Sequence, residues 1–294
     1  MRWKNARQSQ NVDDRRGKRG KKVMGGSLGV ILLALFAIFI QKKPFQQVVQ
    51  ETMQRQQQSG QPQGEYVPTP EEQELAAFTR TVLAFTEDVW NNLYPQMARS
   101  YRGARPRYEE PVLVLFSGVT PTACSTGQAA MGPFYCPGDN QVYIDLSFFD
   151  ELEKKFEAPG DFAQAYVIAH EVGHHIQNLL GISRQVQSQR QRLSKQAYNR
   201  LSVKLELQAD YLAGVWAHHT QRQFDVLQRG DIEEGIKAAM AVGDDTIQRR
   251  ATGRIVPENF THGTSEQRIR WFTIGLKSGD PVGHSPFEMD DREL

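Results

Sequence analysis

Residues 161–181 read DFAQAYVIAHEVGHHIQNLLG, and the interpretation of the whole chain starts from this stretch. It predicts one helix, with Asp161 as a favourable N-cap and Gly181 as a favourable residue to end it. On a helix, His170 and His174 are four residues apart, so both imidazoles lie on the same face, one turn from each other. Two imidazoles in this arrangement can bind the same metal ion.

The residue after the first histidine adds a chemical function to the pair. Glu171 is offset by about 100° from His170 around the helix, where it can reach a metal-bound water. The motif His-Glu-x-x-His is therefore typical of a zinc site with a carboxylate base. The alternative interpretation is an ordinary amphipathic helix with two surface histidines.

A catalytic zinc ion needs three protein ligands and one open position. A third histidine six positions after the second is excluded, because that position is Leu180. Glu206 is the next candidate, in a helical segment where Asp210 lies one turn further on. We expect Glu206 to bind the metal and Asp210 to accept the spare N–H of a ligand histidine. The alternative is that both carboxylates face solvent. Three residues are weaker candidates for the site: Asp245, His218 and His219.

Charge is distributed unevenly along the chain. The formal net charge is +1, but residues 1–22 hold nine Lys or Arg against two Asp, and residues 23–294 hold 26 basic and 32 acidic residues. The acidic body argues against a nucleic-acid partner. Residues 1–22 are therefore interpreted as a basic cytoplasmic head.

The segment after the basic head is strongly apolar. Residues 23–40, VMGGSLGVILLALFAIFI, contain no charge and would span about 27 Å as a helix, close to the thickness of a bilayer core. A cleaved signal peptide is the alternative, but no small-residue cleavage site follows. We expect a single-pass anchor in the inner (cytoplasmic) membrane. The basic head predicts a cytoplasmic N-terminus and a catalytic domain that is periplasmic or otherwise extracytoplasmic.

Residues 41–70 are rich in Gln and are interpreted as a tether, followed by a folded domain over residues 71–294. Residues 112–116 (VLVLF) predict a buried strand, and residues 134–146 a hairpin. From residue 148 onward the pattern is helical. The expected fold class is α+β, mainly helical with a small sheet, preceded by one transmembrane helix.

The chain has two cysteines, Cys124 and Cys136. In an oxidising compartment this pair is a reasonable disulfide. Two free, buried thiols are the alternative.

Four segments together carry a resemblance to a known family: 132–137 (GPFYCP), 145–149 (DLSFF), 170–175 (HEVGHH) and 206–210 (ELQAD). The histidine pair with the downstream Glu-x-x-x-Asp is similar to the gluzincin class of zinc peptidases. More closely, the segments resemble the bacterial neutral zinc metallopeptidase family, the YpfJ-like proteins, over nearly the whole chain. The resemblance implies a zincin-like fold and peptidase activity, and it does not imply a substrate.

Residues 261–268 (THGTSEQR) precede another predicted helix, where Thr264 and Gln267 form a capping box. His262 lies in the loop just before it. The segment is similar to the His-Pro-x-x-x-x-Arg segment of membrane-linked gluzincins, with Gly263 in place of Pro. Such a histidine can donate to the oxyanion of a tetrahedral intermediate. The alternative is a structural histidine that is hydrogen-bonded within the loop.

These features predict a membrane-anchored zinc metalloendopeptidase with a peptide or protein substrate. Zn²⁺ would be bound by His170, His174 and Glu206, and Glu171 would act as general base towards a zinc-activated water. One alternative is an inactive zincin-fold scaffold or binding protein with structural zinc. Glu171 favours the enzyme, because a structural site needs no base. An amidase acting on cell-wall peptides is a third interpretation, although the chain contains nothing like a wall-binding module.

Overall fold

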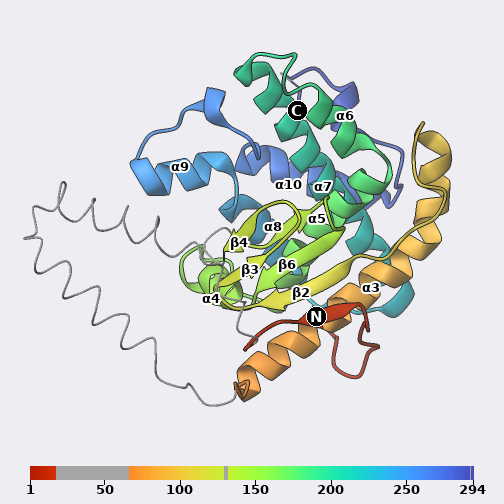
Figure 1. Ribbon diagram of the computed structural model, residues 1–294, viewed down its shortest axis with the longest axis vertical. Coiled ribbons are helices and arrows are strands. Elements are labelled where there is room, and N and C mark those ends of the chain that lie inside the picture. The colour runs from red at the N-terminus through yellow and green to blue at the C-terminus, as the bar shows by residue number, and fades with distance from the viewer. Residues whose placement is uncertain (18–65, 129–131, 292) are drawn as a thin grey trace, which may run out of the picture. The chain divides into compact units, whose positions relative to one another are not determined.

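The computed structural model describes residues 1–17, 66–128, 132–291 and 293–294. Residues Met1–Arg15 and Thr69–Leu294 form one compact unit, with its strands early in the chain and most of its helices late (Figure 1). The strands are β1 (Val12–Asp14), β2 (Val112–Phe116), β3 (Val119–Pro121), β4 (Thr126–Gln128), β5 (Phe134–Cys136) and β6 (Gln141–Asp145). The α-helices are α3 (Pro70–Ser100), α4 (Ser147–Lys154), α5 (Asp161–Leu179), α6 (Ile182–Ser188), α7 (Lys195–Phe224), α8 (Asp231–Ala241), α9 (Asp244–Thr252) and α10 (Ser265–Ser278). Two 3₁₀ turns, η2 (Pro257–Asn259) and η3 (Pro286–Glu288), lie near the end of the chain.

The main sheet has the strand order β1-β2-β6-β5. The apolar strand β2 is in the interior of the sheet and pairs in parallel with both β1 and β6. Strand β5 pairs antiparallel with β6, so the predicted hairpin and the predicted buried strand are both confirmed. Strands β3 and β4 form a separate antiparallel pair. Strand β5 is therefore an edge strand of the main sheet.

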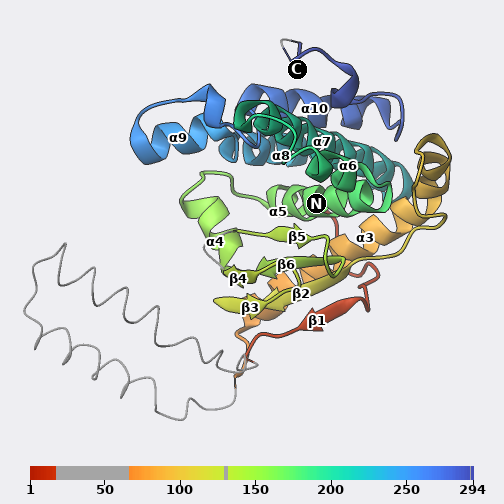
Figure 2. The same ribbon diagram turned by 45° about the horizontal axis from the view of Figure 1, so that its top comes forward.

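The helices lie in layers on the sheet. Figure 2 shows α5 above the sheet, with α7, α8 and α10 above α5. These elements share one apolar core, in which Trp90, Trp216 and Trp271 are buried almost completely. Because α5 packs between the sheet and the outer helices, its central residues are screened from bulk water.

Helices α7 and α10 pack against each other at unusually close range. A Cβ atom at Gly275 of α10 would stand only 2.0 Å from the carbonyl oxygen of Tyr211 in α7. Any side chain at this position would therefore force the two helices apart. The close contact fixes the C-terminal half of α10 relative to α7.

The N-terminal residues belong to the same unit as the late helices. The Met1 ammonium lies 2.5 Å from Asp161 Oδ1 and 3.3 Å from Asp231 Oδ2, at the first residues of α5 and α8. The residue that caps α5 is Gly160, so the prediction of Asp161 as N-cap was wrong. The side chain of Asp161 does not cap the helix and instead forms an ion pair with the Met1 ammonium.

The position of β1 corrects the predicted topology. Residues 12–14 pair with residues 113–115 in one sheet, so they cannot lie on the other side of a membrane from the domain. Residues Met1–Arg15 therefore belong to the same compact unit as Thr69–Leu294. This pairing does not support the single-pass topology with a cytoplasmic N-terminus and the domain on the opposite side of the membrane.

The predicted fold class is also corrected. A mainly helical α+β unit with a small sheet is present. However, among the residues that the structure describes, no helix has both the length and the apolar character needed to cross a membrane. The expected transmembrane helix at residues 23–40 and most of the expected tether at residues 41–70 lie outside the described residues. The fold class is therefore α+β, without the predicted transmembrane helix.

Cys124 and Cys136 form a disulfide, with 5.9 Å between their Cα atoms. The bond joins the loop before β4 to the end of β5. Cys136 is completely buried. The disulfide therefore ties the edge strand β5 to the β3–β4 pair.

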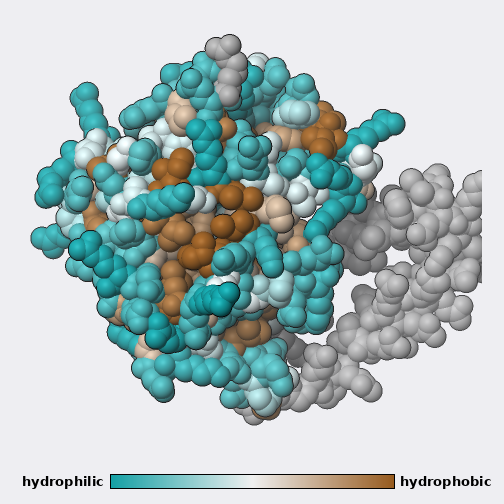
Figure 3. Space-filling model, turned by 180° about the vertical axis from the view of Figure 1, so that it is seen from behind, coloured by the Kyte–Doolittle hydropathy of each residue, from teal (hydrophilic) through white to brown (hydrophobic). Residues whose placement is uncertain are grey.

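The face shown in Figure 3 is mostly hydrophilic at its rim and carries a central band of hydrophobic residues. Large apolar side chains are exposed at several places in the unit, including Ile247 and Ile255, at 39% and 41%. Single exposed apolar residues are common in proteins. Their position relative to a cavity, rather than exposure alone, decides whether they bear on function.

Candidate metal centre

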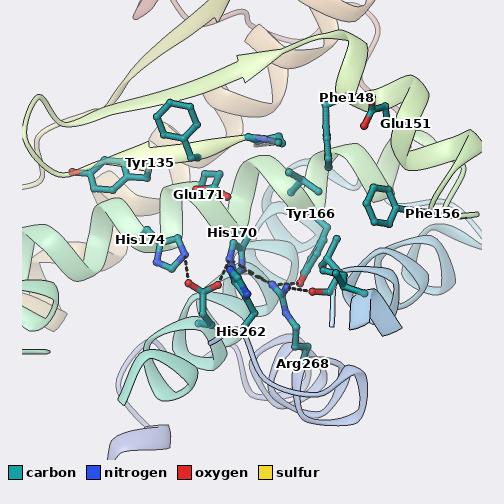
Figure 4. A pocket seen from close by; sticks show the side chains of 17 residues that line it. Tyr135, Phe148, Glu151, Phe156, Tyr166, His170, Glu171, His174, His262 and Arg268 are labelled. Carbon is teal, nitrogen blue, oxygen red and sulfur yellow. Dashed lines mark hydrogen bonds and ion pairs between the residues drawn. The ribbon is translucent and has the colours of Figure 1, made fainter. Parts of the chain in front are cut away.

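Helices α5 and α7 bring three potential metal ligands together. His170 Nε2 is 3.2 Å from Glu206 Oε2, and His174 Nε2 is 3.4 Å from Glu206 Oε1. One possible ligand atom from each of the three residues lies within 4.8 Å of the other two. Figure 4 shows the side chains of His170 and His174 next to each other. The structure thus places at one point the three residues that the sequence indicated as ligands.

Gly173 allows the two ligand-bearing helices to approach this closely. A Cβ atom at this position would stand 3.0 Å from the carbonyl oxygen of Ala209 and 3.1 Å from its Cα. These are rigid backbone atoms, so even the methyl group of alanine would push α5 away from α7. The glycine between the two histidines therefore contributes to the distance between the rings and Glu206.

The electrostatics of the three residues are strongly coupled. Burial alone would lower the pKa of His170, but the Asp210 and Glu206 carboxylates outweigh it and raise this pKa to about 9. Burial also opposes protonation of His174, and Glu206 nevertheless raises its pKa. Burial would raise the pKa of Glu206, but the two histidines hold it well below its usual range. The site thus favours protonated histidines beside an ionised carboxylate. A divalent cation could take the place of the protons on these histidines.

Asp210 binds the other nitrogen of His170, at 2.8 Å between Nδ1 and Oδ1. It is completely buried and also accepts hydrogen bonds from Tyr166 and from the guanidinium of Arg268. Burial would raise the pKa of Asp210, but Arg268 and His170 lower it to about 2. The ionised carboxylate keeps a hydrogen on Nδ1 of His170, so Nε2 is directed at Glu206.

The sequence interpretation did not include Tyr166 or Arg268. Tyr166 lies four residues before His170, and this spacing was an available signal for a shared helical face. Arg268 is 58 residues from Asp210 in the chain, and no local pattern connects them. Their meeting depends on the close packing of α10 against α7.

A cavity of about 470 Å³ opens beside the three ligands, and Glu171 lines it. Only 8% of Glu171 is exposed. Among the described residues, none donates a hydrogen bond to its carboxylate. Its place beside His170 and His174 is consistent with a role towards a molecule that enters the cavity.

His262 also lines this cavity, from the loop before α10. Its Nδ1 lies 3.1 Å from Asp244 Oδ1, and its ring is half exposed. Asp244 Oδ2 accepts hydrogen bonds from three successive backbone N–H groups of the loop, at residues 261–263. The predicted capping box of Thr264 and Gln267 is confirmed. Asp244 therefore holds both the loop and the ring at the edge of the cavity.

The cavity has an apolar end away from His174. Phe148 and Phe156 lie there with a 6.4 Å distance between ring centroids, on the side of Tyr166 (Figure 4). The apolar lining is completed by Val167, Val242 and Ile247. Phe134 and Tyr135 of the edge strand β5 form another part of the wall. An extended chain lying along β5 would thus place side chains near both the ligands and the apolar end.

The three weaker candidates lie elsewhere. Asp245 accepts hydrogen bonds from the backbone and hydroxyl of Ser265, so it anchors the start of α10 and does not contact a ligand histidine. His218 and His219 are hydrogen-bonded to the carbonyl oxygens of Leu276 and Gly279, at the end of α10. These contacts indicate structural roles.

Comparison with known proteins agrees with this geometry. The sequence profile of the family described as "Putative neutral zinc metallopeptidase" matches residues 1–287. The chain belongs to this family. The matched residues include strand β1 as well as the candidate metal ligands.

Relatives of this chain occur in Escherichia coli and in Mycobacterium. "Uncharacterized protein YpfJ" of Escherichia coli strain K12 is 46% identical over 98% of this chain and 99% of its own length. "Uncharacterized protein Rv2575" of Mycobacterium tuberculosis strain H37Rv is 44% identical over 60% of this chain and 62% of its own length. No solved structure matches the chain.

The donor set fits the zinc ion that the family name implies. Two imidazoles and one carboxylate are a known ligand set for catalytic zinc. Asp210 and Gln177 occupy the Nδ1 atoms of His170 and His174, which leaves both Nε2 atoms for a metal. The adjoining cavity leaves one side of the site open to a further ligand, as a catalytic site requires.

Proposed function

We propose that this protein is a zinc-dependent metalloendopeptidase that hydrolyses peptide bonds. His170, His174 and Glu206 are the metal ligands in this proposal, and Glu171 is the general base. The observation that supports it best is the convergence of two imidazoles and a carboxylate beside a cavity that Glu171 also lines. A three-ligand site that opens into a cavity is typical of catalytic zinc rather than structural zinc.

Each side chain of the site has a separate task in this mechanism. When bound, zinc supplies Lewis acidity, which polarises a carbonyl and makes water more acidic. Glu171 takes a proton from the attacking water and transfers it to the leaving amine. The Nδ1–H of His262 donates a hydrogen bond to Asp244, so a protonated ring presents Nε2–H to the developing oxyanion. Asp210 keeps His170 in the orientation in which Nε2 faces the metal.

The cavity walls indicate how a substrate would bind. Strand β5 is an edge strand, and an extended peptide can add to such an edge through main-chain hydrogen bonds. The apolar end around Phe148 and Phe156 favours a large apolar side chain of the substrate. We therefore propose a peptide or unfolded protein segment with such a residue near the cleaved bond.

The alternative function is a scaffold that binds zinc without hydrolysis. The position of Glu171 argues against this alternative. A scaffold has no use for a carboxylate that lines the cavity beside the two ligand histidines. The third interpretation, an amidase of wall peptides, is supported by no observation on the described residues.

The test uses the purified full-length chain, with and without zinc, on a mixed peptide library read by mass spectrometry. We expect cleavage that a chelator abolishes and added zinc restores. Glu171→Gln should keep its zinc and lose activity by about 10²- to 10⁴-fold, the usual contribution of a general base.

The matched control is Glu153→Gln, the same change at an exposed position of α4. It should leave both zinc content and cleavage unchanged. If the zinc-loaded protein cleaves nothing in the library, the scaffold function is favoured. Full activity in Glu171→Gln would remove this residue from the mechanism.

A further inference from the structure

Gln177 connects the two helices that carry the candidate metal ligands. Its side chain is completely buried, three residues after His174 on α5. Its Oε1 lies 2.9 Å from His174 Nδ1. Its Nε2 lies 2.6 Å from the carbonyl oxygen of Leu205 and 3.1 Å from Gln208 Oε1, both on α7. One amide thus contacts His174 on α5 and the residue next to Glu206 on α7.

The partners of this amide determine its orientation. The backbone carbonyl of Leu205 can only accept a hydrogen bond, so the Gln177 atom that faces it must be the NH₂ group. The amide oxygen must then face His174. An oxygen can only accept, so Nδ1 of His174 must carry the hydrogen. This leaves Nε2 of His174 directed at Glu206, at 3.4 Å from Oε1.

The two histidines are therefore held by different groups. Asp210, a carboxylate on α7, binds Nδ1 of His170, whereas Gln177, a neutral amide on α5, binds Nδ1 of His174. An amide differs from a carboxylate because it also donates. Gln177 donates a hydrogen bond to the Leu205 carbonyl. Its side chain therefore links the ring of His174 to the backbone beside Glu206.

We propose that Gln177 is a positioning residue of the metal centre. It holds His174 with Nε2 towards the metal and ties the ring to the α7 segment that carries Glu206. The assignment rests on the proposed zinc site, but it does not depend on whether the protein cleaves peptides. Groups that orient a metal ligand in this way commonly change metal affinity by about 10- to 100-fold when they are removed.

The test compares two substitutions at residue 177 in the full-length protein. Gln177→Met fills a similar volume without hydrogen bonds, whereas Gln177→Glu keeps an acceptor for Nδ1 of His174. Zinc affinity is measured by competition with a chromogenic chelator. Gln177→Met should weaken it by about 10- to 100-fold. Gln177→Glu, which keeps the acceptor for Nδ1 of His174 but loses the donor to Leu205, should recover part of the loss. The visible d–d bands of the cobalt-loaded protein should change in Gln177→Met, because they report the geometry of the ligands.

Gln208→Met is the matched control. Gln208 is also a buried glutamine, and it contacts Gln177 without contacting either histidine. This variant should be destabilised to a similar degree, yet it should keep its zinc affinity and its cobalt spectrum. An equal loss of affinity in Gln177→Met and Gln208→Met would show that packing alone matters and would overturn the assignment.

Two further outcomes separate this assignment from the proposed function. Tight zinc binding by wild type together with an unaffected Gln177→Met would refute the assignment alone. A wild-type chain that binds no zinc would refute the metal centre and the assignment with it. If Gln177→Met does not fold, Gln177→Glu is compared with wild type, and a loss of zinc affinity beyond about 100-fold would contradict the proposal.

Discussion

Arg268 and Asp210 form a buried two-point ion pair, with 2.8 Å between Nε and Oδ2 and 2.9 Å between Nη2 and Oδ1. The same carboxylate binds His170, so α10 supports a candidate metal ligand that it does not contain. Removal of the guanidinium would leave a buried charge without its main partner. We expect Arg268→Met to lower the free energy of unfolding by about 3–5 kcal/mol, measured by urea denaturation of the zinc-free protein.

Arg270→Met is the control for this change. Arg270 lies on the same helix but is exposed, and its guanidinium donates a hydrogen bond to the backbone carbonyl of Glu293. Its substitution should change the free energy of unfolding by no more than about 0.5 kcal/mol. Equal effects of the two substitutions would contradict the importance of the Arg268–Asp210 pair.

The proposed ligands predict a specific pattern of zinc loss. His170→Ala, His174→Ala and Glu206→Ala should each lose most of the bound zinc, measured by elemental analysis after dialysis, because only three protein ligands are available. His219→Ala should retain full zinc, since this histidine binds the carbonyl of Gly279 instead. Full zinc in Glu206→Ala would exclude that residue as a ligand.

The pair of His262 and Asp244 predicts a pH effect. The hydrogen bond to Asp244 raises the pKa of His262. The ring therefore keeps both hydrogens to a higher pH than an ordinary histidine and loses the Nε2 hydrogen as pH rises through the raised pKa. In Asp244→Asn the raised pKa should fall, so the alkaline decline of kcat/KM should begin at lower pH.

This shift is measured from pH–rate profiles of wild type and Asp244→Asn on the same peptide. His262→Gln should have a lower kcat at neutral pH and lack the part of the alkaline decline that His262 causes. An alkaline limb that is identical in wild type, Asp244→Asn and His262→Gln would mean that His262 does not act on the oxyanion.

The apolar end of the cavity predicts substrate preference. Ile247 lines the cavity from α9, whereas Ile255 is equally exposed but does not line it. Ile247→Glu should lower kcat/KM by about tenfold or more for peptides with a large apolar residue near the cleaved bond. Ile255→Glu should have no such effect. A library profile that is the same in both variants would place the substrate side chain elsewhere.

The sequence was sufficient for the local features of this protein. Periodicity and capping patterns predicted the helix with His170 and His174, the strand at residues 112–116 and the Thr264 capping box, because these depend on neighbours in the chain. Local patterns were less reliable where tertiary contacts compete with them. Proline ordinarily ends or kinks a helix, but α3 continues through Pro95 to Ser100.

Tertiary structure alone decided how the site is supported. Tyr166 and Arg268 meet at Asp210, and Asp244 holds His262, through contacts between helices that are distant in sequence. It also decided that β1, in a segment whose charges indicated a separate head, pairs with β2. Charge and hydrophobic patterns describe one segment at a time. The hydrogen-bond partners of a buried polar group depend on which helices pack together, and a single sequence does not contain that information in any local pattern.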